Sequence, residues 1–543
     1  MPGTCNIFEI FLVIFVLVGK LSGDEISLSF MIGDEMKRRW LHKKYAFEEK
    51  RKAAQEEEKI ASTFLYKIKK SNDFISSYNE CAKTPYHIYY IHSLIDLEIV
   101  HRDILINFNE KVYKTIEEVK HDIPIENAII TKDESKIEEK LLHGYVAIQL
   151  DNEDKDCILL PAEKSKGRTV SLPEVEFSVV GPKESFTETL STNINLIRKR
   201  LPIPDLEIKE LTVGKLSKTK VAVLSIHGIA NQENVNTVIQ RIEDIQFDQI
   251  NDSSYITQLI QDNNNSPFPQ FIDTERPDRV AAVLAEGKVV VLADGAPHGL
   301  IGPTTLIEFF SAFEDYFLNW ILASFFRVIR FFAVIFSILV TPIYVAVLTY
   351  HYELIPKDLV STLVTSRSAI PLPPFLEAMI LELAIELLRE AGARLPTKVG
   401  QTIGIVGGIV IGTASVEAGL TSNVLLIIVA LSALASFTTP VYQMGNTIRL
   451  IRFPFLVLAH IWGLLGVGIC FCFLLIHLLR LTSLGRPFME PLYPLRLWDL
   501  RDSIIRLPFQ LQTKRPIETQ SEETIRFNKK EKDKLKDIDE YST

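Results

Sequence analysis

The chain has no excess of basic residues. Its 59 Lys and Arg are outnumbered by 68 Asp and Glu, and the formal net charge of −9 is spread over both signs. Binding to nucleic-acid phosphates needs a basic face, and no such face is evident in the sequence. The charge balance therefore argues against nucleic acid as a partner.

Cysteine is scarce, with five residues in 543. None has the paired spacing of a metal site or a redox motif, and the last two lie within an apolar run. The five are Cys5, Cys81, Cys157, Cys470 and Cys472. We expect them to be reduced and structural, and we expect neither a metal site nor a cofactor.

The common catalytic signatures are missing as well. The sequence contains no G-x-S-x-G nucleophile turn, no Walker phosphate loop and no GxGxxG turn. His-Gly and Asp-Gly pairs at 227–228, 294–295 and 298–299 follow apolar stretches but lack catalytic partners, so they are interpreted as turn residues. We therefore expect that the chain is not an enzyme.

Long apolar runs dominate residues 321–485, whereas both ends of the chain are polar. This pattern predicts an integral membrane protein with a large soluble N-terminal part. The expected regions are a peripheral or non-native extension (1–36), two soluble subdomains (37–180 and 181–320), a membrane domain (321–485) and a polar tail (486–543) that is disordered after about residue 510.

The extreme N-terminus carries an apolar stretch at residues 7–18. It is too short to span a bilayer, contains Glu9 and lacks the basic start of a signal peptide. Two interpretations stay open. The stretch is either a peripheral anchor or upstream sequence that is not translated, with Met31 or Met36 as the start.

The soluble part alternates strand and helix patterns. Apolar strands are expected at 145–150, 157–160, 220–226 and 288–293, with helical patterns before and between them. Strands that alternate with helices predict mixed or parallel sheets covered by helices. The predicted fold class is an α/β soluble region of two subdomains with mixed sheets, followed by an α-helical membrane domain.

Apolar segments long enough to cross the membrane lie at 331–350, 401–420, 423–442 and 454–479. Arg327 and Arg330 precede the first segment, which predicts a cytoplasmic soluble part. If the charged segment 375–392 also crosses, there are five spans and the tail is outside. If it re-enters or lies in the interface, there are four spans and the tail is inside; we favour this second arrangement.

The segment FLEAMILELAIELLREAG at 375–392 is predicted to be a helix with a stripe of charges. The stripe consists of Glu382, Glu386, Arg389 and Glu390. Glu386 can pair with Arg389 at i+3, and Glu390 can pair with Arg394 at i+4. Charges at bilayer depth must pair or meet water or headgroups. The segment is either an interfacial amphipathic helix or a charged vestibule or coupling contact beside an ion pathway.

The segment GQTIGIVGGIVIG has a glycine at every fourth position. These are Gly400, Gly404, Gly408 and Gly412. Such a stripe permits close helix packing in a bilayer. The roughly opposite helix face carries Val406, Val410, Thr413 and Glu417. This face suits a pore wall with a hydrophobic constriction. The alternative is a face that touches lipid or another helix.

Four segments carry a resemblance to a known family. They are GPKESFTETLSTNINLIRKRLPIPDL (181–206), TERPDRVAAVLAEGKVVVLADGAP (274–297), ELLREAGARLP (386–396) and RDSIIRLP (501–508). In this combination the chain resembles the A subunit of GerA-type spore germinant receptors, over about residues 140–508.

The resemblance implies residence in the inner membrane of a bacterial spore, with a permease-like B subunit and a lipoprotein C subunit as partners. It also implies that A subunits form a homo-oligomeric ring that releases monovalent cations when a nutrient triggers the receptor. A close alternative is the paralogous A-like subunit of a spore ion-release channel. A third reading is a scaffold for the B and C subunits that conducts nothing.

Polar residues in two of these segments are candidates for interdomain contacts. They are Glu184, Asn193, Arg198, Glu275, Arg276 and Asp278. Two positions depart from the family pattern near the junction with the membrane. The stretch at 312–320 (AFEDYFLNW) loses later charges, and the pair at 298–299 replaces an apolar pair, which puts signal coupling across this junction in question.

Overall fold

The computed structural model describes residues 67–80, 82–123, 125, 127–150, 156–163, 173, 176, 178, 180–395, 404–495 and 504–526. The described residues from Ile68 onward belong to one compact unit. The predicted extension at 1–36, Gly400, and the tail beyond residue 526 lie outside the described residues.

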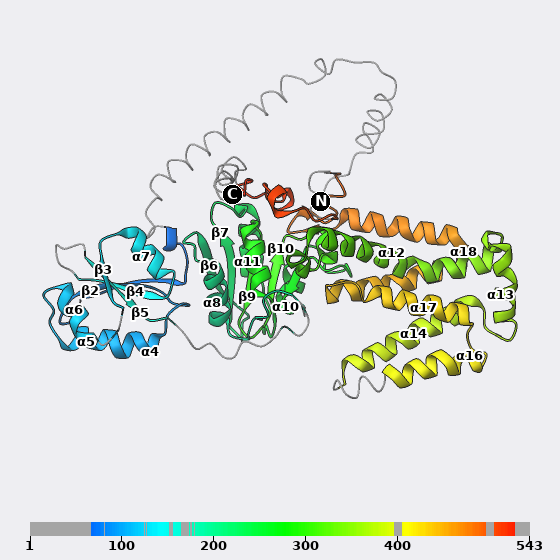
Figure 1. Ribbon diagram of the computed structural model, residues 1–543, viewed down its shortest axis with the longest axis horizontal. Helices are drawn as coiled ribbons and strands as arrows, with labels where there is room; N and C mark the ends of the chain where they lie inside the picture. Colours follow the sequence, from blue (N-terminus) through cyan, green and yellow to red (C-terminus); the bar gives the residue numbers. More distant parts are fainter. Residues whose placement is uncertain are drawn as a thin grey trace, which may run out of the picture. The chain divides into compact units, whose positions relative to one another are not determined.

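The first subdomain is built on a five-stranded sheet in the order β1-β2-β4-β5-β3. The strands are β1 (Phe74–Asn79), β2 (Tyr86–Ile91), β3 (Ile129–Thr131), β4 (Tyr145–Leu150) and β5 (Cys157–Pro161). On one side lie α4 (Leu97–Ile99), the π-helical turn Val100–Leu105, α5 (Ile106–Glu110) and α6 (Ile116–Asp122), and on the other lies α7 (Glu134–Leu141) (Figure 1). The main core of this subdomain forms between the sheet and the first group.

The second subdomain repeats this plan with a sheet in the order β6-β7-β9-β10-β8. The strands are β6 (Leu206–Val213), β7 (Thr219–Ile226), β8 (Ile272–Thr274), β9 (Val289–Ala293) and β10 (Gly299–Gly302). The helices are α8 (Leu190–Arg200), α9 (Gln232–Glu243), α10 (Ser253–Ile260) and α11 (Pro277–Ala285). Helices α8 and α11 share a core with one face of the sheet, and α9 and α10 share a core with the other.

The two α/β subdomains confirm the predicted fold class, but the sheets are not mixed. Every strand pairing within the described residues is antiparallel. Strand β7 shows why the sequence suggested otherwise: Val223 packs toward α9 while Leu224 packs toward α8. A strand that is buried on both faces has a continuous apolar sequence, whether its neighbouring strands are parallel or antiparallel to it.

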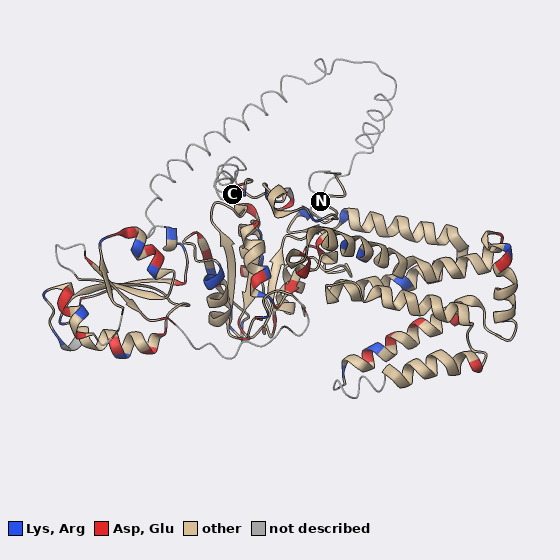
Figure 2. Cartoon of the chain, viewed as in Figure 1, with Lys and Arg blue, Asp and Glu red and all other residues tan. Residues whose placement is uncertain are grey.

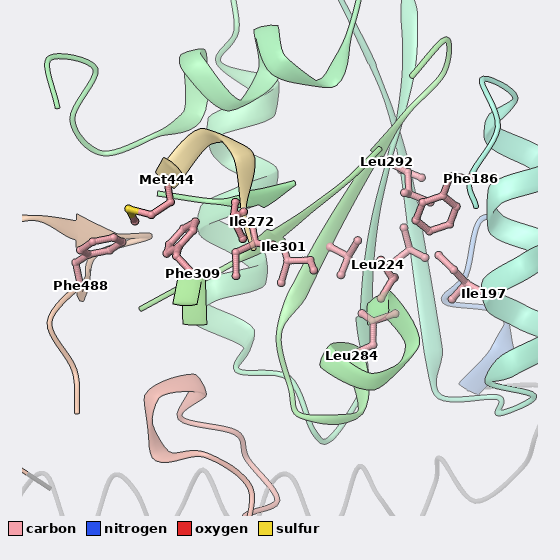
Figure 3. Packing of buried hydrophobic residues seen from close by; sticks show 14 of the residues in the cluster. Phe186, Ile197, Leu224, Ile272, Leu284, Leu292, Ile301, Phe309, Met444 and Phe488 are labelled. Atoms are coloured by element: carbon pink, nitrogen blue, oxygen red, sulfur yellow. The ribbon is translucent and has the colours of Figure 1, made fainter. Parts of the chain in front are cut away.

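The core of the second subdomain continues into the membrane region. Leu224, Leu292 and Ile301 of the sheet belong to the same cluster as Met444 and Phe488, which lie near the two ends of the last long helix (Figure 3). The soluble subdomain and that helix are therefore packed together by buried apolar side chains rather than joined by a flexible linker.

The main helical segments among the described residues of the membrane region are α12 (Trp320–Tyr350), α13 (Lys357–Arg367), α14 (Pro374–Ala393), the helix Gly404–Glu417, α17 (Asn423–Ser436) and α18 (Tyr442–Arg480). Helix α14 confirms the helix predicted at 375–392. Helix α18 begins twelve residues before the predicted span at 454. Gly463, where φ is 61°, divides it into two helical arms that pack against each other through Phe455, Ala459, Val467 and Cys470.

Two of these helices, α12 and α18, are long and apolar enough to cross a membrane. The span predicted at 423–442 is shorter in the structure than in the prediction. The span predicted at 401–420 begins outside the described residues, and its described helix ends at Glu417. Helix α17 has 14 residues and so reaches about 21 Å, which is less than a hydrocarbon core of about 30 Å. The span predicted to reach residue 442 ends early because the chain turns at Thr438–Pro440 before α18 begins.

The segment that follows α18 returns to the second subdomain. The backbone N–H of Glu522 donates to the carbonyl of Ile229 at 3.0 Å, and Arg515 Nε donates to the carbonyl of Ala285 at 2.9 Å. Residues 511–526, predicted to be disordered, are packed there. The described part of the tail and the second subdomain are therefore in contact, and the number of membrane crossings stays a prediction.

Candidate functional site

The centre of the candidate site is a buried ion pair between α14 and α18. Arg452 Nη1 donates to Glu382 Oε2 at 2.5 Å, and both side chains are at most 3% exposed. Arg452 Nη2 also donates to Ser337 Oγ at 3.0 Å, and Thr341 Oγ1 donates to the second oxygen of Glu382 at 3.2 Å. The carboxylate and the guanidinium are therefore paired inside the chain, in contact with α12.

A second ion pair lies one turn further along α14. Glu386 pairs with Arg389 of its own helix and, at 3.7 Å, with Arg449 of α18. Both arginines also donate to the side-chain oxygen of Asn446. These groups are partly exposed, with about a quarter of the Glu386 and Arg389 side chains open. The acids of α14 thus follow the arginines of α18 in antiparallel register.

The last predicted pair of the stripe is open to the surroundings. Glu390 and Arg394 pair at 2.5 Å with side chains 59% and 78% exposed. The i+3 and i+4 pairs that the spacing predicted within α14 are thus both present. Burial of the stripe falls steadily from Glu382 to Glu390, so its first half contacts protein and its end does not.

Glu377 forms a separate buried contact at the start of α14. Its side chain pairs with Arg367 of α13 at 2.8 Å and accepts the backbone N–H of Ser422, the N-cap of α17, at 3.2 Å. This contact joins three helices. Spacing within α14 does not reveal this contact, because the partner Arg367 lies on another helix, α13.

The helix Gly404–Glu417 is open on both faces that the sequence distinguished. Val406 and Val410 are each 54% exposed, and Thr413 and Glu417 are exposed as well. A Cβ atom placed on Gly404, Gly408 or Gly412 would meet nothing within 4 Å. The helix contacts α14 through Gly407 instead, where an added Cβ would collide with Leu388.

The same helix changes its hydrogen-bond pattern at the predicted pore face. Residues Val410–Ala414 form a π-helical turn, and Ser415 Oγ donates to the carbonyl of Val410 at 3.0 Å. Such a turn shifts the side chains that follow it around the helix axis, and π-turns occur frequently at functional sites. Figure 2 shows where charge lies around it: α14 carries both signs, whereas α17 carries none.

Among the six residues predicted for interdomain contacts, Arg198 contacts the first subdomain. Its guanidinium is fully buried, with Nε 3.3 Å from Asp73 Oδ2 and Nη2 2.9 Å from Ser71 Oγ. Asn195, which the sequence did not single out, donates from the same helix to the carbonyl of Ser93 at 2.6 Å. Residues of α8 therefore bind the start of β1 and the end of β2.

Arg276 and Asp278 link the second subdomain to the segment before α12. The two side chains pair at 2.6 Å, and Arg276 stacks over the rings of Phe313 and Phe317, 5.4 and 5.8 Å away. It also donates to the carbonyl of Pro182 at 3.2 Å.

The other three interdomain candidates have their described partners inside the second subdomain. Asn193 bonds the backbone of Thr187, Glu184 pairs with Arg200 at 2.6 Å, and Glu275 lies 3.9 Å from His298. Their role in contacts between subdomains stays a prediction.

The junction between the soluble part and α12 is organised by Asp315. This fully buried carboxylate accepts from Arg327 at 3.1 Å and from Arg330 at 2.6 Å. Arg506 of the tail then donates to the backbone carbonyls of Asp315, Tyr316 and Leu318 at 2.7, 3.0 and 2.5 Å. The two arginines that the sequence used as markers of the cytoplasmic side thus have a protein partner.

The fold and these contacts define a protein with two α/β subdomains, the second of which packs onto apolar helices that are held together by buried ion pairs. A family model described as Bacillus/Clostridium GerA spore germination protein matches residues 62–518. The chain belongs to this GerA family of spore germination proteins.

Named relatives cover most of the chain. It is 53% identical over 469 residues to spore germination protein GerQA of Bacillus cereus, covering 86% of this chain and 94% of the relative. It is 48% identical to spore germination protein GerIA of the same organism (84% and 68% covered), and 37% identical to spore germination protein A1 of Bacillus subtilis (83% and 93%). The N-terminal domain of the A subunit of the Bacillus megaterium spore germinant receptor GerK3 aligns with 26% identity and a TM-score of 0.33, over 44% of this chain and 91% of that domain.

Proposed function

We propose that the chain is the A subunit of a nutrient-responsive spore germination receptor in the spore inner membrane, with its soluble subdomains in the cytoplasm. Copies of the chain form a ring that conducts monovalent cations. A permease-like B subunit receives the nutrient, and a lipoprotein C subunit completes the receptor. The chain itself is not an enzyme.

The observation that carries this proposal is the helix Gly404–Glu417, whose two faces are both uncovered within the described chain. Glycines at 404, 408 and 412 allow another helix to approach closely, and a second copy of this chain supplies one in a ring. The exposed Val406 and Val410 on the roughly opposite face then lie toward the ring axis, where a hydrophobic constriction can block ions by excluding water.

The charged stripe supports a coupling role rather than a vestibule. Glu382 and Glu386 are engaged by α18, and α18 begins with Met444 and Ile448 inside the core of the second subdomain. A displacement of that subdomain moves the first turns of α18 and, through the buried ion pairs, α14. The helix Gly404–Glu417 contacts α14 through Gly407, so a displacement of α14 also moves this helix.

Assembly is tested by cross-linking copies through the glycine face. Gly408→Cys, in a chain whose native cysteines are replaced by serine, introduces a thiol where the single chain has nothing within 4 Å. Oxidation in native membranes should give a covalent dimer. The matched control is Ile427→Cys on α17, which is 58% exposed. Monomer only, or equal cross-linking from both variants, would contradict a ring closed by the glycine face.

A further inference from the structure

The tail forms a strap over the second subdomain; residues 504–526 are called the strap here. It is bound at separate points: Arg506 holds the junction before α12, Arg515 bonds the end of α11, and Glu522 bonds the backbone at Ile229. Between these points lies a cavity of about 1330 Å³, lined by the strap, α11 and the 3-10 turns Leu306–Phe310 and Phe313–Phe317. The strap also bonds α9 and the segment after α18: Asn231 and Asn234 donate to the carbonyls of Gln520 and Thr519, and Arg486 donates to the side chain of Gln520. It is therefore held by a set of discrete polar contacts.

One of these contacts is a partly buried cluster with more acid than base. Lys288 Nζ lies 2.5 Å from both carboxylate oxygens of Glu308, and only 3% of the Lys288 side chain is exposed. Glu518 of the strap hydrogen-bonds to Glu308 from the other side. One ammonium group thus serves two carboxyl groups at the wall of the cavity.

A hydrogen bond between two carboxyl groups requires a proton on one of them. Burial, the charge of Glu308 and the hydrogen bond to Glu308 raise the pKa of Glu518 well above its ordinary value. Burial alone would raise the pKa of Glu308 too, but the Lys288 ammonium and the hydrogen bonds hold it below its ordinary value. The proton therefore resides on Glu518.

The neighbouring charges around this cluster have partners of their own. Glu286 at the end of α11, which adds repulsion at Glu518, pairs with Arg526 at 2.6 Å. Arg279 of α11, which acts on Glu308, pairs with Glu176 at 2.5 Å. The further basic groups of the strap that line the cavity are Lys514 and Arg515, and Arg515 pairs with Glu523 at 3.1 Å. A second carboxylate in the cluster would thus be poorly compensated.

We propose that Glu518 is a proton-dependent contact that holds the strap on the second subdomain, so that loss of its proton releases the strap and with it the grip of Arg506 on the junction before α12. Two carboxylates sharing one buried ammonium repel each other, and the strap is the element that can move. The state of the junction is then set by proton activity on the side of the membrane where the soluble subdomains lie. This proposal concerns the strap alone and does not depend on ion conduction.

The direction of the pH dependence follows from where the proton is bound. In the released strap Glu518 has the ordinary glutamate value of 4.5, and in the bound strap its pKa is higher. The bound state therefore carries the extra proton. Binding of the strap is strongest below pH 4.5, weakens about tenfold per pH unit above it, and reaches its lowest level once the pH passes the raised pKa.

The test is hydrogen–deuterium exchange of the full-length protein in detergent from about pH 5 to about pH 9, expressed as protection factors relative to the unfolded chain at each pH. In the wild type, protection of the Glu522 amide should fall as pH rises. Glu518→Gln keeps the shape and a hydrogen-bond donor but cannot titrate, so its protection should stay constant. Glu522→Gln removes an exposed acid of the same strap and should follow the wild type.

Protection in helix α8, far from the strap in sequence, reports in the same data whether each variant is folded. If Glu518→Gln does not fold, Glu518→Ala is used in its place. The expected result for Glu518→Ala is low protection of the strap amides at every pH. The proposal is overturned if wild-type protection is constant over the pH range, or if protection in either Glu518 variant falls in parallel with the wild type.

Discussion

Removal of the Glu382 carboxylate tests the buried ion pair between α14 and α18. In Glu382→Ala, Arg452 stays buried without its carboxylate and Thr341 loses its acceptor, while only the contact with Ser337 remains. Breaking a buried pair by removing one partner generally costs about 3–5 kcal/mol, because an uncompensated charge is left inside the protein.

Two further variants separate the ion pair from a general effect of charge on α14. Glu390→Ala removes an acid of the same helix whose pair with Arg394 is largely exposed, and such pairs contribute about 0–1 kcal/mol. The double variant Glu382→Leu with Arg452→Met removes both buried charges and should restore most of the loss, since apolar side chains of similar volume can replace a buried pair.

The assay is thermal unfolding of the purified chain in detergent. At roughly 2 °C per kcal/mol, Glu382→Ala should lower the midpoint by about 6–10 °C, and Glu390→Ala should lower it by about 2 °C at most. The reasoning is refuted if the two single variants lose the same amount, or if the double variant is less stable than Glu382→Ala.

The remaining predictions concern the soluble part and the strap. Arg198→Ala should destabilise the contact between subdomains by about 3 kcal/mol, whereas the more exposed Arg200→Ala should cost less than about 1 kcal/mol, as measured by thermal unfolding. Arg506→Lys keeps the positive charge but loses the planar set of guanidinium N–H donors that bond the backbone carbonyls before α12. Hydrogen–deuterium exchange of the strap amides should therefore accelerate about tenfold. Burial raises the pKa of Cys157 to about 12, so maleimide should label this thiol at about pH 8 only after unfolding.

Local features of the fold could be predicted from spacing. The charges of α14 recur at i, i+4 and i+8, which predicted one stripe and both pairs within the helix. The strands of the two subdomains could be located, but not their pairing, because a run such as that of β7 records burial on both faces and carries no information about strand direction.

The partners of the stripe could not be found by spacing within one helix. Arg452 lies 70 positions beyond Glu382, on a different helix. A signal was present: two acids one turn apart, at 382 and 386, match two arginines one turn apart, at 449 and 452, in antiparallel order. Recognising the match requires knowing that α14 and α18 are neighbours, which depends on the packing of the whole bundle.

The glycine stripe illustrates the opposite case. Its periodicity is evident in the sequence, yet the structure provides no neighbour for Gly404, Gly408 or Gly412 within the described residues. The neighbour that fits it belongs, in our proposal, to a second copy of the chain, and no property of a single chain can reveal it.

Cation flux from liposomes that contain the purified chain tests the central proposal most directly. The comparison is between Val406→Ser and Val410→Ser, which make the proposed constriction polar, and Ile427→Ser, an equally exposed apolar position on α17. If the helix Gly404–Glu417 lines a pore, the two valine variants should release potassium without nutrient, while the wild type and Ile427→Ser retain it. Potassium retention by well-assembled valine variants, equal to that of the wild type, would contradict the pore and favour a scaffold that conducts nothing.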